Sequence, residues 1–305
     1  MKNSIFKRTA LFLTLTLGLA AATHSFAQAP RRGIYGDWNV KTQFGERDFD
    51  SILNFSRDGD GNTTGSWIAF WGVTELKNVK LEENQLRFTQ TFRGRDAEMT
   101  SDFKGTIEDG KLAGTLSSDR GESKVTGGRA SRVSRAAGSW TVKIKAGERE
   151  YTGTLTIKSG SDGTLTGTWS SQRGEQKVSD LAYNRGELTF KRTIKTQDSE
   201  WETAFQGNIR GNALTGVFKS DRGEAETVGE RIGGSAIGTW NLDLESEAGP
   251  RHQRLVINPD LSGLYGSTAI DTLKVDNSQV SFKVSMEFGD RQLNWDFQGK
   301  IDEDT

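Results

Sequence analysis

Five tryptophans are the residues of this sequence best suited to contact a ligand: Trp67, Trp71, Trp169, Trp201 and Trp295. In the run WIAFW, Trp67 and Trp71 lie four residues apart, so a continuous strand places both indoles on one face. Trp201 and Trp295 each precede the phenylalanine of a Phe-x-Gly motif by an even number of residues, which predicts an inward face. Such indoles could line a ligand pocket or stack on a sugar ring, and they could equally fill a hydrophobic core.

The most conspicuous charged motif is the run SDRGE, which occurs at 118–122 and again at 220–224. One interpretation is a repeated recognition tip, and the other is a hairpin turn in which Gly121 and Gly223 adopt positive φ. The hairpin turn is the simpler hypothesis, because residues repeated between two units can be repeated for folding alone. The charged side chains that would form the tip are Arg120, Glu122, Arg222 and Glu224.

Signals for catalysis or metal binding are weak. Asp58, Asp60 and Asn62 alternate as in a calcium loop, but Thr63 and Ala69 stand where such a loop needs glycine and glutamate. A hairpin loop is therefore favoured, and we expect no metal ion, no cofactor and no enzymatic activity. A pair of carboxylates for glycoside hydrolysis stays open as an alternative, because the chain has 41 acidic residues.

The first 27 residues have the pattern of a secretory signal peptide. Lys2, Lys7 and Arg8 precede an apolar run at 10–22, and the segment 25–27 matches a cleavage site. Removing these three basic residues leaves 37 against 41 acidic ones, a net charge near −4 that gives no support to nucleic-acid binding. We therefore expect a periplasmic or secreted protein with no membrane span after signal cleavage.

The rest of the composition favours a β protein without disulfides. No cysteine occurs in the chain, so packed cores must stabilise it outside the cytoplasm. Glycine is abundant, at 36 residues against three prolines, which suits antiparallel strands with tight turns. His252 is the only histidine after the signal segment and lies among polar residues, which favours a solvated side chain over a catalytic one.

A long repeat organises the chain. A Gly-x-Trp motif opens each unit, and the three tryptophans of these motifs are 102 and 100 residues apart. Each unit later carries Phe-x-Gly. The repeat predicts complete units at 34–131 and 137–232 and a shorter unit at 237–305.

Alternating apolar and polar residues predict half-buried antiparallel strands, as in WTVKI at 140–144. We expect an all-β chain of tandem up-and-down β-barrels with about eight short strands each, and a β-sandwich is the alternative. The third barrel is expected to be incomplete, because it lacks the equivalent of residues 214–231. We expect the chain to be a fragment of a longer protein, and completion of this unit by another chain is the alternative.

Gly-x-Trp at the start of a unit, with an arginine near its end, resembles the calycin superfamily of lipocalins and avidin-like barrels. The resemblance implies that the tryptophan plugs the closed end of the barrel and that the arginine stacks across the indole. By this resemblance Trp38 meets Arg129 and Trp140 meets Arg231, whereas Trp240 has no such arginine. The units also resemble uncharacterised lipocalin-like modules of secreted bacterial proteins.

The sequence as a whole predicts an exported, non-enzymatic array of binding modules. The ligand would be a small apolar or sugar-like molecule, or the partner would be an envelope or secreted protein. Two alternatives remain: a purely structural or protein-interaction scaffold, and a carboxylate-based hydrolase. Because the opening tryptophans are structural in this interpretation, a binding site is expected at the opposite end of the barrels.

Overall fold

The computed structural model describes residues 33–93, 98–195, 199–245, 250–288 and 291–301. Residues from Ile34 onward form one compact unit. The signal segment predicted at 1–27 lies outside the described residues. Across the described ranges, no helix is long and apolar enough to cross a membrane.

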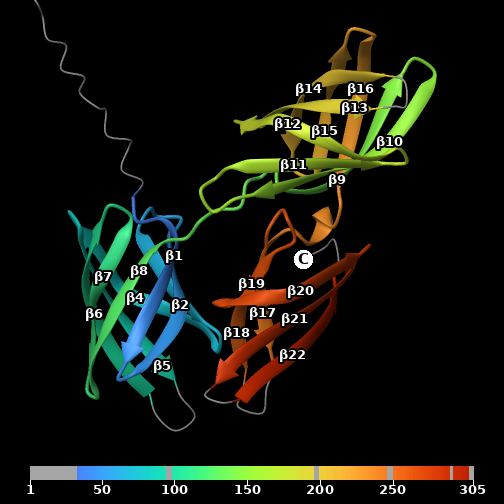
Figure 1. Cartoon of the computed structure of the whole chain (residues 1–305). Coiled ribbons are helices and arrows are strands. Elements are labelled where there is room, and N and C mark those ends of the chain that lie inside the picture. The colour runs from blue at the N-terminus through green and yellow to red at the C-terminus, as the bar shows by residue number, and fades with distance from the viewer. Residues whose placement is uncertain (1–32, 94–97, 196–198, 246–249, 289–290, 302–305) are drawn as a thin grey trace, which may run out of the picture. The chain divides into compact units, whose positions relative to one another are not determined.

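The first eight strands form a closed antiparallel barrel, here named barrel 1 (Figure 1). Its strands are β1 (Gly36–Phe44), β2 (Arg47–Arg57), β3 (Thr63–Ala69), β4 (Gly72–Glu82), β5 (Gln85–Arg93), β6 (Glu98–Glu108), β7 (Lys111–Ser118) and β8 (Gly121–Arg129). Each strand pairs with the next, and β1 pairs with both β2 and β8. The sheet therefore has no open edge.

The next eight strands form a second closed barrel of the same order, named barrel 2. Its strands are β9 (Gly138–Ala146), β10 (Arg149–Ser159), β11 (Leu165–Ser171), β12 (Gly174–Asn184), β13 (Glu187–Lys195), β14 (Glu200–Arg210), β15 (Ala213–Ser220) and β16 (Gly223–Arg231). Closure repeats the register of barrel 1, because Trp140 pairs with Arg231 just as Trp38 pairs with Arg129.

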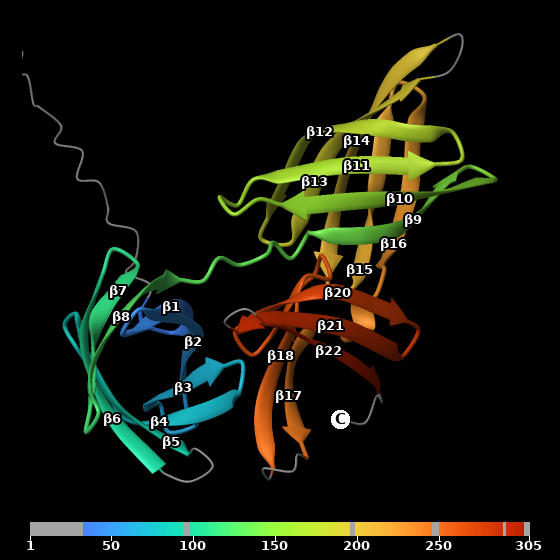
Figure 2. The same cartoon turned by 60° about the horizontal axis from the view of Figure 1, so that its bottom comes forward.

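Six further strands form the third sheet, which follows a short 3-10 turn at Gly234–Ala236. They are β17 (Gly238–Leu244), β18 (Arg251–Ile257), β19 (Gly263–Tyr265), β20 (Thr268–Asp276), β21 (Gln279–Phe288) and β22 (Arg291–Lys300). The sheet curls without closing (Figure 2), and within the described residues β17 and β22 pair with no further strand. The predicted all-β fold, with two barrels and an incomplete third one, is confirmed.

Strand alternation builds each interior. In β1, Trp38, Val40 and Thr42 are buried while Asn39 and Lys41 are exposed. Burying a large apolar side chain contributes roughly 1.5–3 kcal/mol, so one apolar row per strand is enough to form a core. The lean hydrophobic content of 33% is compatible with a folded chain for this reason.

Both copies of SDRGE form the turn between the last two strands of a barrel. Ser118 pairs with Gly121 across two turn residues, and Ser220 pairs with Gly223 in the same way. The two glycines have φ of 113° and 115°, a region that favours residues without a Cβ. The hairpin-turn interpretation of this motif is confirmed.

An arginine packs over the opening tryptophan of each complete barrel. The guanidinium carbon of Arg129 lies 4.6 Å from the ring centre of Trp38, and that of Arg231 lies 3.9 Å from the ring centre of Trp140. The indole Nε1 of Trp38 donates to the carbonyl oxygen of Ile34 at 2.7 Å. This hydrogen bond ties the segment before β1 to the barrel, and Ile34 packs in the core of barrel 1.

Arg231 also ties the linker to barrel 2. Its Nη1 donates to the carbonyl oxygen of Ala137, and its Nη2 donates to that of Arg135 at 2.6 Å. Burial lowers the pKa of Arg231 to about 10, which leaves the side chain charged at neutral pH. The backbone carbonyls and the indole face compensate this buried charge.

We predict that Arg231→Ala weakens barrel 2 by about 2–3 kcal/mol, because it removes two charge-assisted hydrogen bonds and the contact with Trp140. Hydrogen exchange of peptides from β9 and β16 measures the local loss of protection. Arg210→Ala is the matched control, since Arg210 is exposed on the same barrel; it should change stability by less than about 0.5 kcal/mol. Equal protection in the two variants would contradict a closing role for Arg231.

Candidate functional site

The mouth of barrel 1, at the end of the strands away from Trp38, contains a cavity of about 160 Å³, here named the barrel 1 hollow. Its wall is mainly apolar, with five aromatic side chains, and includes four polar side chains. The lining residues are Thr42, Phe44, Phe49, Ser51, Trp67, Trp71, Gln90, Phe92, Met99, Ser101 and Leu116. They come from six of the eight strands and from one turn, so the closed barrel is what brings them together.

Small side chains create the space inside the barrel 1 hollow. Thr42, Ser51 and Ser101 are only 2%, 3% and 4% exposed, and they hold inward positions on β1, β2 and β6. Two residues deeper on the same strands, larger inward groups fill the interior: Val40, Leu53 and Phe103. The hollow therefore begins at the level where the inward residues change from large to small.

Trp67 forms the floor of the barrel 1 hollow, and Trp71 forms its rim. Trp67 is 5% exposed and packs edge-on against Phe88, with ring centres 6.2 Å apart. Trp71 is 41% exposed and makes edge contacts with Phe49 and Phe92, at 6.3 and 6.2 Å between ring centres. Trp71 lies in the turn after β3, so it reaches the hollow from the turn rather than by strand alternation.

A group bound in the barrel 1 hollow would meet mostly apolar surface. The buried Oγ1 of Thr42 has no hydrogen-bond partner among the described residues, so a ligand hydroxyl could satisfy it. The volume is close to that of an engineered apolar cavity of about 150 Å³ that holds one benzene ring. No charged side chain is among the lining residues. This chemistry suits the binding of a neutral ligand, and it supplies no carboxylate for hydrolysis.

Arg192 occupies the corresponding space in barrel 2. It stands two residues after the buried Phe190, as Gln90 does after the equivalent phenylalanine of barrel 1. Its guanidinium carbon lies 4.3 Å from the ring centre of Trp169 and 4.5 Å from that of Phe218. Trp169 of β11 is 2% exposed and is therefore covered by an arginine from β13, a strand with which β11 does not pair.

The guanidinium of Arg192 is buried at 7% exposure, and its Nε has no hydrogen-bond partner among the described residues. Burial, and secondarily the charge of Arg173, lowers the pKa of Arg192 to about 10. The group is still protonated at neutral pH, and the two aromatic faces below it offset part of the cost of burying a charge. Arg192 thus fills the level of barrel 2 at which barrel 1 is hollow.

Trp201 and Trp295 have different surroundings. Trp201 is half-buried, and the guanidinium carbon of Arg222 lies 4.1 Å from its ring centre. Arg222 belongs to the second SDRGE turn, so this charged residue packs on an indole of its own barrel. Trp295 lies in the third sheet, where its ring centre is 4.7 Å from that of Phe70 in barrel 1.

The turn between β3 and β4 of barrel 1 reaches the core of the third sheet. Besides its contact with Trp295, Phe70 packs against Tyr265, with ring centres 5.9 Å apart. Gln253 of β18 donates from Nε2 to the carbonyl oxygens of Ala69 and Phe70, at 3.1 and 2.7 Å. Phe70 of barrel 1 therefore packs into the aromatic cluster on the inner face of the third sheet.

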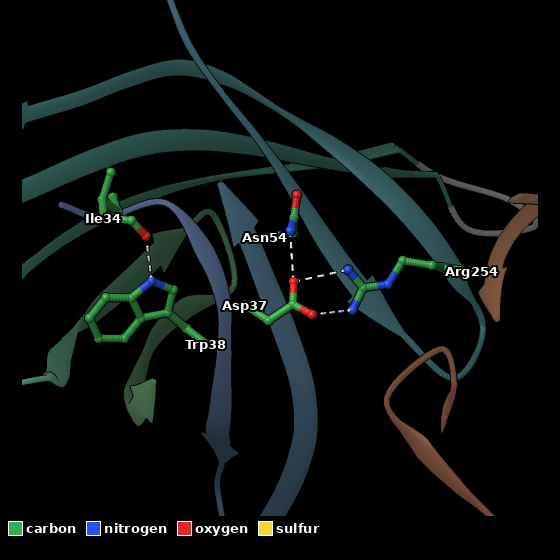
Figure 3. A network of polar contacts seen from close by, with 5 residues as sticks. All are labelled: Ile34, Asp37, Trp38, Asn54 and Arg254. Carbon is green, nitrogen blue, oxygen red and sulfur yellow. Dashed lines mark hydrogen bonds and ion pairs between the residues drawn. The ribbon is translucent and has the colours of Figure 1, made fainter. Parts of the chain in front are cut away.

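A carboxylate next to the opening tryptophan of barrel 1 reinforces this contact (Figure 3). Asp37 accepts hydrogen bonds from Arg254 Nη1 and Nη2 of β18, at 3.0 and 3.1 Å, and from Asn54 Nδ2 at 2.7 Å. Arg254 is 8% exposed. A bidentate pair of charged groups is stronger and geometrically more specific than a single surface ion pair.

The structure thus brings two of the five candidate tryptophans, Trp67 and Trp71, into one cavity. Trp169, Trp201 and Trp295 instead contact Arg192, Arg222 and Phe70. The remaining lining residues belong to no motif that marks them in the sequence. Even spacing from Trp38 along β1 could have indicated Thr42 and Phe44, and even spacing from Phe88 along β5 could have indicated Gln90 and Phe92.

The other polar candidates have local roles. Asp58 accepts hydrogen bonds from the backbone N–H groups of Asn62, at 2.8 Å, and Asp60, at 3.0 Å; those from Asn62 lower its pKa most. His252 Nδ1 lies 2.6 Å from Asp243 Oδ1 on the surface. Within the described ranges, no group of three or more His, Cys, Asp or Glu is placed to hold a metal ion.

Neither a protein-family model nor a curated protein sequence matches the chain. Matching solved structures include a candidate outer membrane protein of Bacteroides fragilis, with 14% identity, TM-score 0.26, and 65% of this chain and 98% of that chain covered. A protein of unknown function from the DUF3598 family of Nostoc punctiforme has 12% identity and TM-score 0.22, covering 65% and 96%. Transferrin-binding protein B of Haemophilus parasuis, a vaccine antigen in double-mutant form, has 10% identity and TM-score 0.20, covering 82% and 64%.

These likenesses are too low to carry an argument about function. The observed architecture is the stronger finding. Two closed eight-stranded antiparallel barrels, each with strands in simple up-and-down order, fit a calycin-like fold.

We predict that Asp37→Ala weakens the contact between barrel 1 and the third sheet by about 2 kcal/mol, because it leaves the buried guanidinium of Arg254 without its carboxylate. Hydrogen exchange of peptides from β18 measures this change. Asp48→Ala is the control, because Asp48 makes only an exposed ion pair with Lys41 at 3.8 Å, and such pairs contribute little. If β18 exchanges at the same rate in both variants, the Asp37–Arg254 pair does not hold the two parts together.

Proposed function

We propose that this chain is an exported, non-enzymatic binding protein in which barrel 1 takes a small, largely apolar ligand at its mouth. The observation that carries the proposal is the hollow of about 160 Å³, whose aromatic wall surrounds Thr42, Ser51 and Ser101. A concave, mainly apolar site with a few placed polar groups is the usual form of a small-molecule site. The predicted signal peptide at 1–27 supports export.

The dimensions and lining favour a neutral ligand with one ring or a short chain. Drug-sized ligands occupy pockets of roughly 300–1,000 Å³, so such a ligand would extend beyond the rim at Trp71. A charged ligand is disfavoured, because no lining side chain carries an opposite charge to offset its desolvation. A single hydroxyl or carbonyl could bond to Thr42, whose Oγ1 has no hydrogen-bond partner among the described residues.

A sugar-like ligand is supported less well than an apolar one. A sugar ring carries several hydroxyl groups, and each needs a hydrogen-bond partner when it leaves water. The polar lining side chains are Thr42, Ser51, Gln90 and Ser101. Three of the four are small and deeply buried, so they suit one polar group at the floor better than a ring of hydroxyls.

For barrel 2 and for the third sheet, one observation each favours the scaffold alternative. Arg192 fills barrel 2 at the level of the hollow, and Phe70 of barrel 1 occupies the aromatic cluster of the third sheet. We propose that these parts position barrel 1 and present their surfaces to an envelope or secreted protein, whereas small-ligand binding belongs to barrel 1.

We predict that the full chain binds 4-fluorobenzyl alcohol, a one-ring probe with one hydroxyl, and that Gln90→Arg abolishes this binding. The substitution places in barrel 1 the side chain that fills barrel 2. Trp71→Ala should weaken binding about three- to tenfold, because it removes part of the apolar rim. Fluorine NMR of the probe, titrated with protein, measures the dissociation constant of each variant.

Trp201→Ala in barrel 2 is the matched control, since it removes an indole that Arg222 already covers, and it should bind the probe like the wild type. Methyl glucoside in place of the aromatic probe tests the sugar alternative and should show no saturable binding. If Gln90→Arg binds the probe as well as the wild type, the barrel 1 hollow is not the ligand site. The scaffold role would then extend to barrel 1.

A further inference from the structure

The mouth of barrel 2, at the end of its strands away from the contact between Trp140 and Arg231, holds three arginines. They are here named the barrel 2 arginines: Arg173 in the turn after β11, Arg192 on β13 and Arg222 in the turn after β15. Each guanidinium lies over an aromatic ring of the same barrel. The pairs are Arg173 with Tyr151, Arg192 with Trp169 and Phe218, and Arg222 with Trp201.

The barrel 2 arginines have no ion pair with a carboxylate in the described part of the chain. Acidic residues near this mouth pair with lysines instead: Glu200 with Lys195, Glu202 with Lys191, and Glu224 with Lys219. Asp221 precedes Arg222 directly, yet the guanidinium of Arg222 lies over a ring. Burial, and secondarily the charge of Arg173, lowers the pKa of Arg192. Two cations are therefore close enough to repel each other, and no acid of the described chain separates them.

Arg192 has the strongest need for an anionic partner. It is 7% exposed, and within the described residues its guanidinium contacts only aromatic rings. The other buried arginine of barrel 2, Arg231, donates to two backbone carbonyls. The Oε1 of Gln176 is also buried without a hydrogen-bond partner, and Gln176 lies two residues from Val178, which pairs with Arg192. Because buried polar groups normally have partners, this part of barrel 2 is incomplete by itself.

Two of the barrel 2 arginines replace residues that line the barrel 1 hollow. The offset of 102 residues between the first two opening tryptophans also relates Trp71 to Arg173 and Gln90 to Arg192. Trp71 and Gln90 give barrel 1 a neutral rim and wall. The same two positions give barrel 2 two positive charges, so the two mouths have the same architecture and suit groups of different charge.

The surface around these arginines favours a polypeptide over a small acid. Arg192 already fills the interior, so the accessible part is an open rim. On this rim Arg173 and Arg222 are exposed, Tyr151 is 40% exposed and Trp201 is half-buried. Arginine, tyrosine and tryptophan are the residue types that contribute most to protein–protein binding. A small acid on so open a surface would stay in water, where an ion pair contributes little, whereas a polypeptide would cover the rim and exclude water.

We propose that the mouth of barrel 2 binds an acidic segment of a partner polypeptide, with one carboxylate on Arg192 and neighbouring acidic side chains on Arg173 and Arg222. This inference rests on the proposed role of barrel 2 in presenting its surface to an envelope or secreted protein, and it names the chemistry that is recognised. The planar guanidinium matches the two oxygens of a carboxylate. Each aromatic ring holds one face of a guanidinium, so the N–H groups at its edge stay available to the acid.

A short fluorescein-labelled peptide of alternating glutamate and serine, titrated with the full chain, tests the proposal by fluorescence anisotropy. We expect saturable binding that weakens as the salt concentration rises, because salt screens the charges of the exposed arginines. A peptide of the same length with glutamine in place of glutamate should show no saturable binding, since it cannot offer a carboxylate to Arg192.

Arg192→Gln should weaken binding of the glutamate peptide at least about tenfold, because it removes the buried partner of the carboxylate. Barrel 1 has glutamine at this position, so the substitution is compatible with the fold. Arg173→Gln and Arg222→Gln change exposed turns and should each weaken binding about two- to fivefold. They test the site independently of any change that Arg192→Gln makes to the interior. Arg210→Gln is the matched control, because it makes the same change of charge at the opposite end of β14, and it should bind like the wild type.

Three outcomes would overturn the proposal. The first is absence of saturable binding by the glutamate peptide, or equal binding by the glutamine peptide. The second is equal weakening by Arg210→Gln and Arg192→Gln, which would show general charge attraction instead of a site. The third is displacement of the peptide by an equal concentration of N-acetylglutamate, which would assign the site to a small acid.

The aromatic probe of barrel 1 separates this test from that of the proposed small-ligand site. Arg173→Gln should bind 4-fluorobenzyl alcohol with the wild-type dissociation constant, since Arg173 does not line the barrel 1 hollow. If the wild-type chain binds this probe and not the glutamate peptide, the acidic docking site is refuted and the barrel 1 site stands. If it binds the peptide and not the probe, the reverse holds.

Discussion

Closure of a β-sheet on itself is the constraint on which the rest of this structure depends. When β1 pairs with β8, every strand in the barrel gains two neighbours, and each inward residue is held at a defined level along the barrel axis. Trp38 then lies at one end and Thr42 near the other, although they are only four positions apart in the chain. The Trp38–Arg129 contact, the packed middle and the barrel 1 hollow therefore lie at three levels of one barrel, and the inward residues at each level determine whether that level is filled or hollow.

The level above the stacked phenylalanines shows how little sequence change alters the interior. The equivalent inward residues are Gln90 in barrel 1, Arg192 in barrel 2 and Val284 in the third sheet. A flexible amide leaves room beside it, whereas a guanidinium spreads over two aromatic rings and fills the space. Val284 is fully buried and adjoins Trp295, which contacts Phe70 of barrel 1. At this level, barrel 1 is therefore hollow and barrel 2 is filled by its own Arg192. In the third sheet, Trp295 packs against Phe70 of barrel 1.

The repeat and the strand alternation were readable from the sequence because both depend on neighbouring residues and on the period of 2 along a strand. Alternation failed at Trp71 because β3 ends at Ala69 and the chain turns before Trp71, so an even spacing from Trp67 no longer describes a face. The packing of Arg192 over Trp169 could not be predicted from the sequence either. It joins β11 to β13, and such a contact depends on the curvature of the closed sheet as well as on local pattern.

The turn after β3 carries two adjacent aromatic residues with different neighbours. Phe70 packs among Tyr265 and Trp295 of the third sheet, while the next side chain, Trp71, borders the cavity of barrel 1. One peptide bond therefore connects a packing interface to the rim of the barrel 1 hollow. By thermodynamic linkage, any ligand that favours one conformation of this turn alters the free energy of packing at Phe70, and packing at Phe70 alters the ligand affinity by the same factor. Because Phe70 and Trp71 are consecutive residues, the turn after β3 belongs both to the interface with the third sheet and to the rim of the barrel 1 hollow.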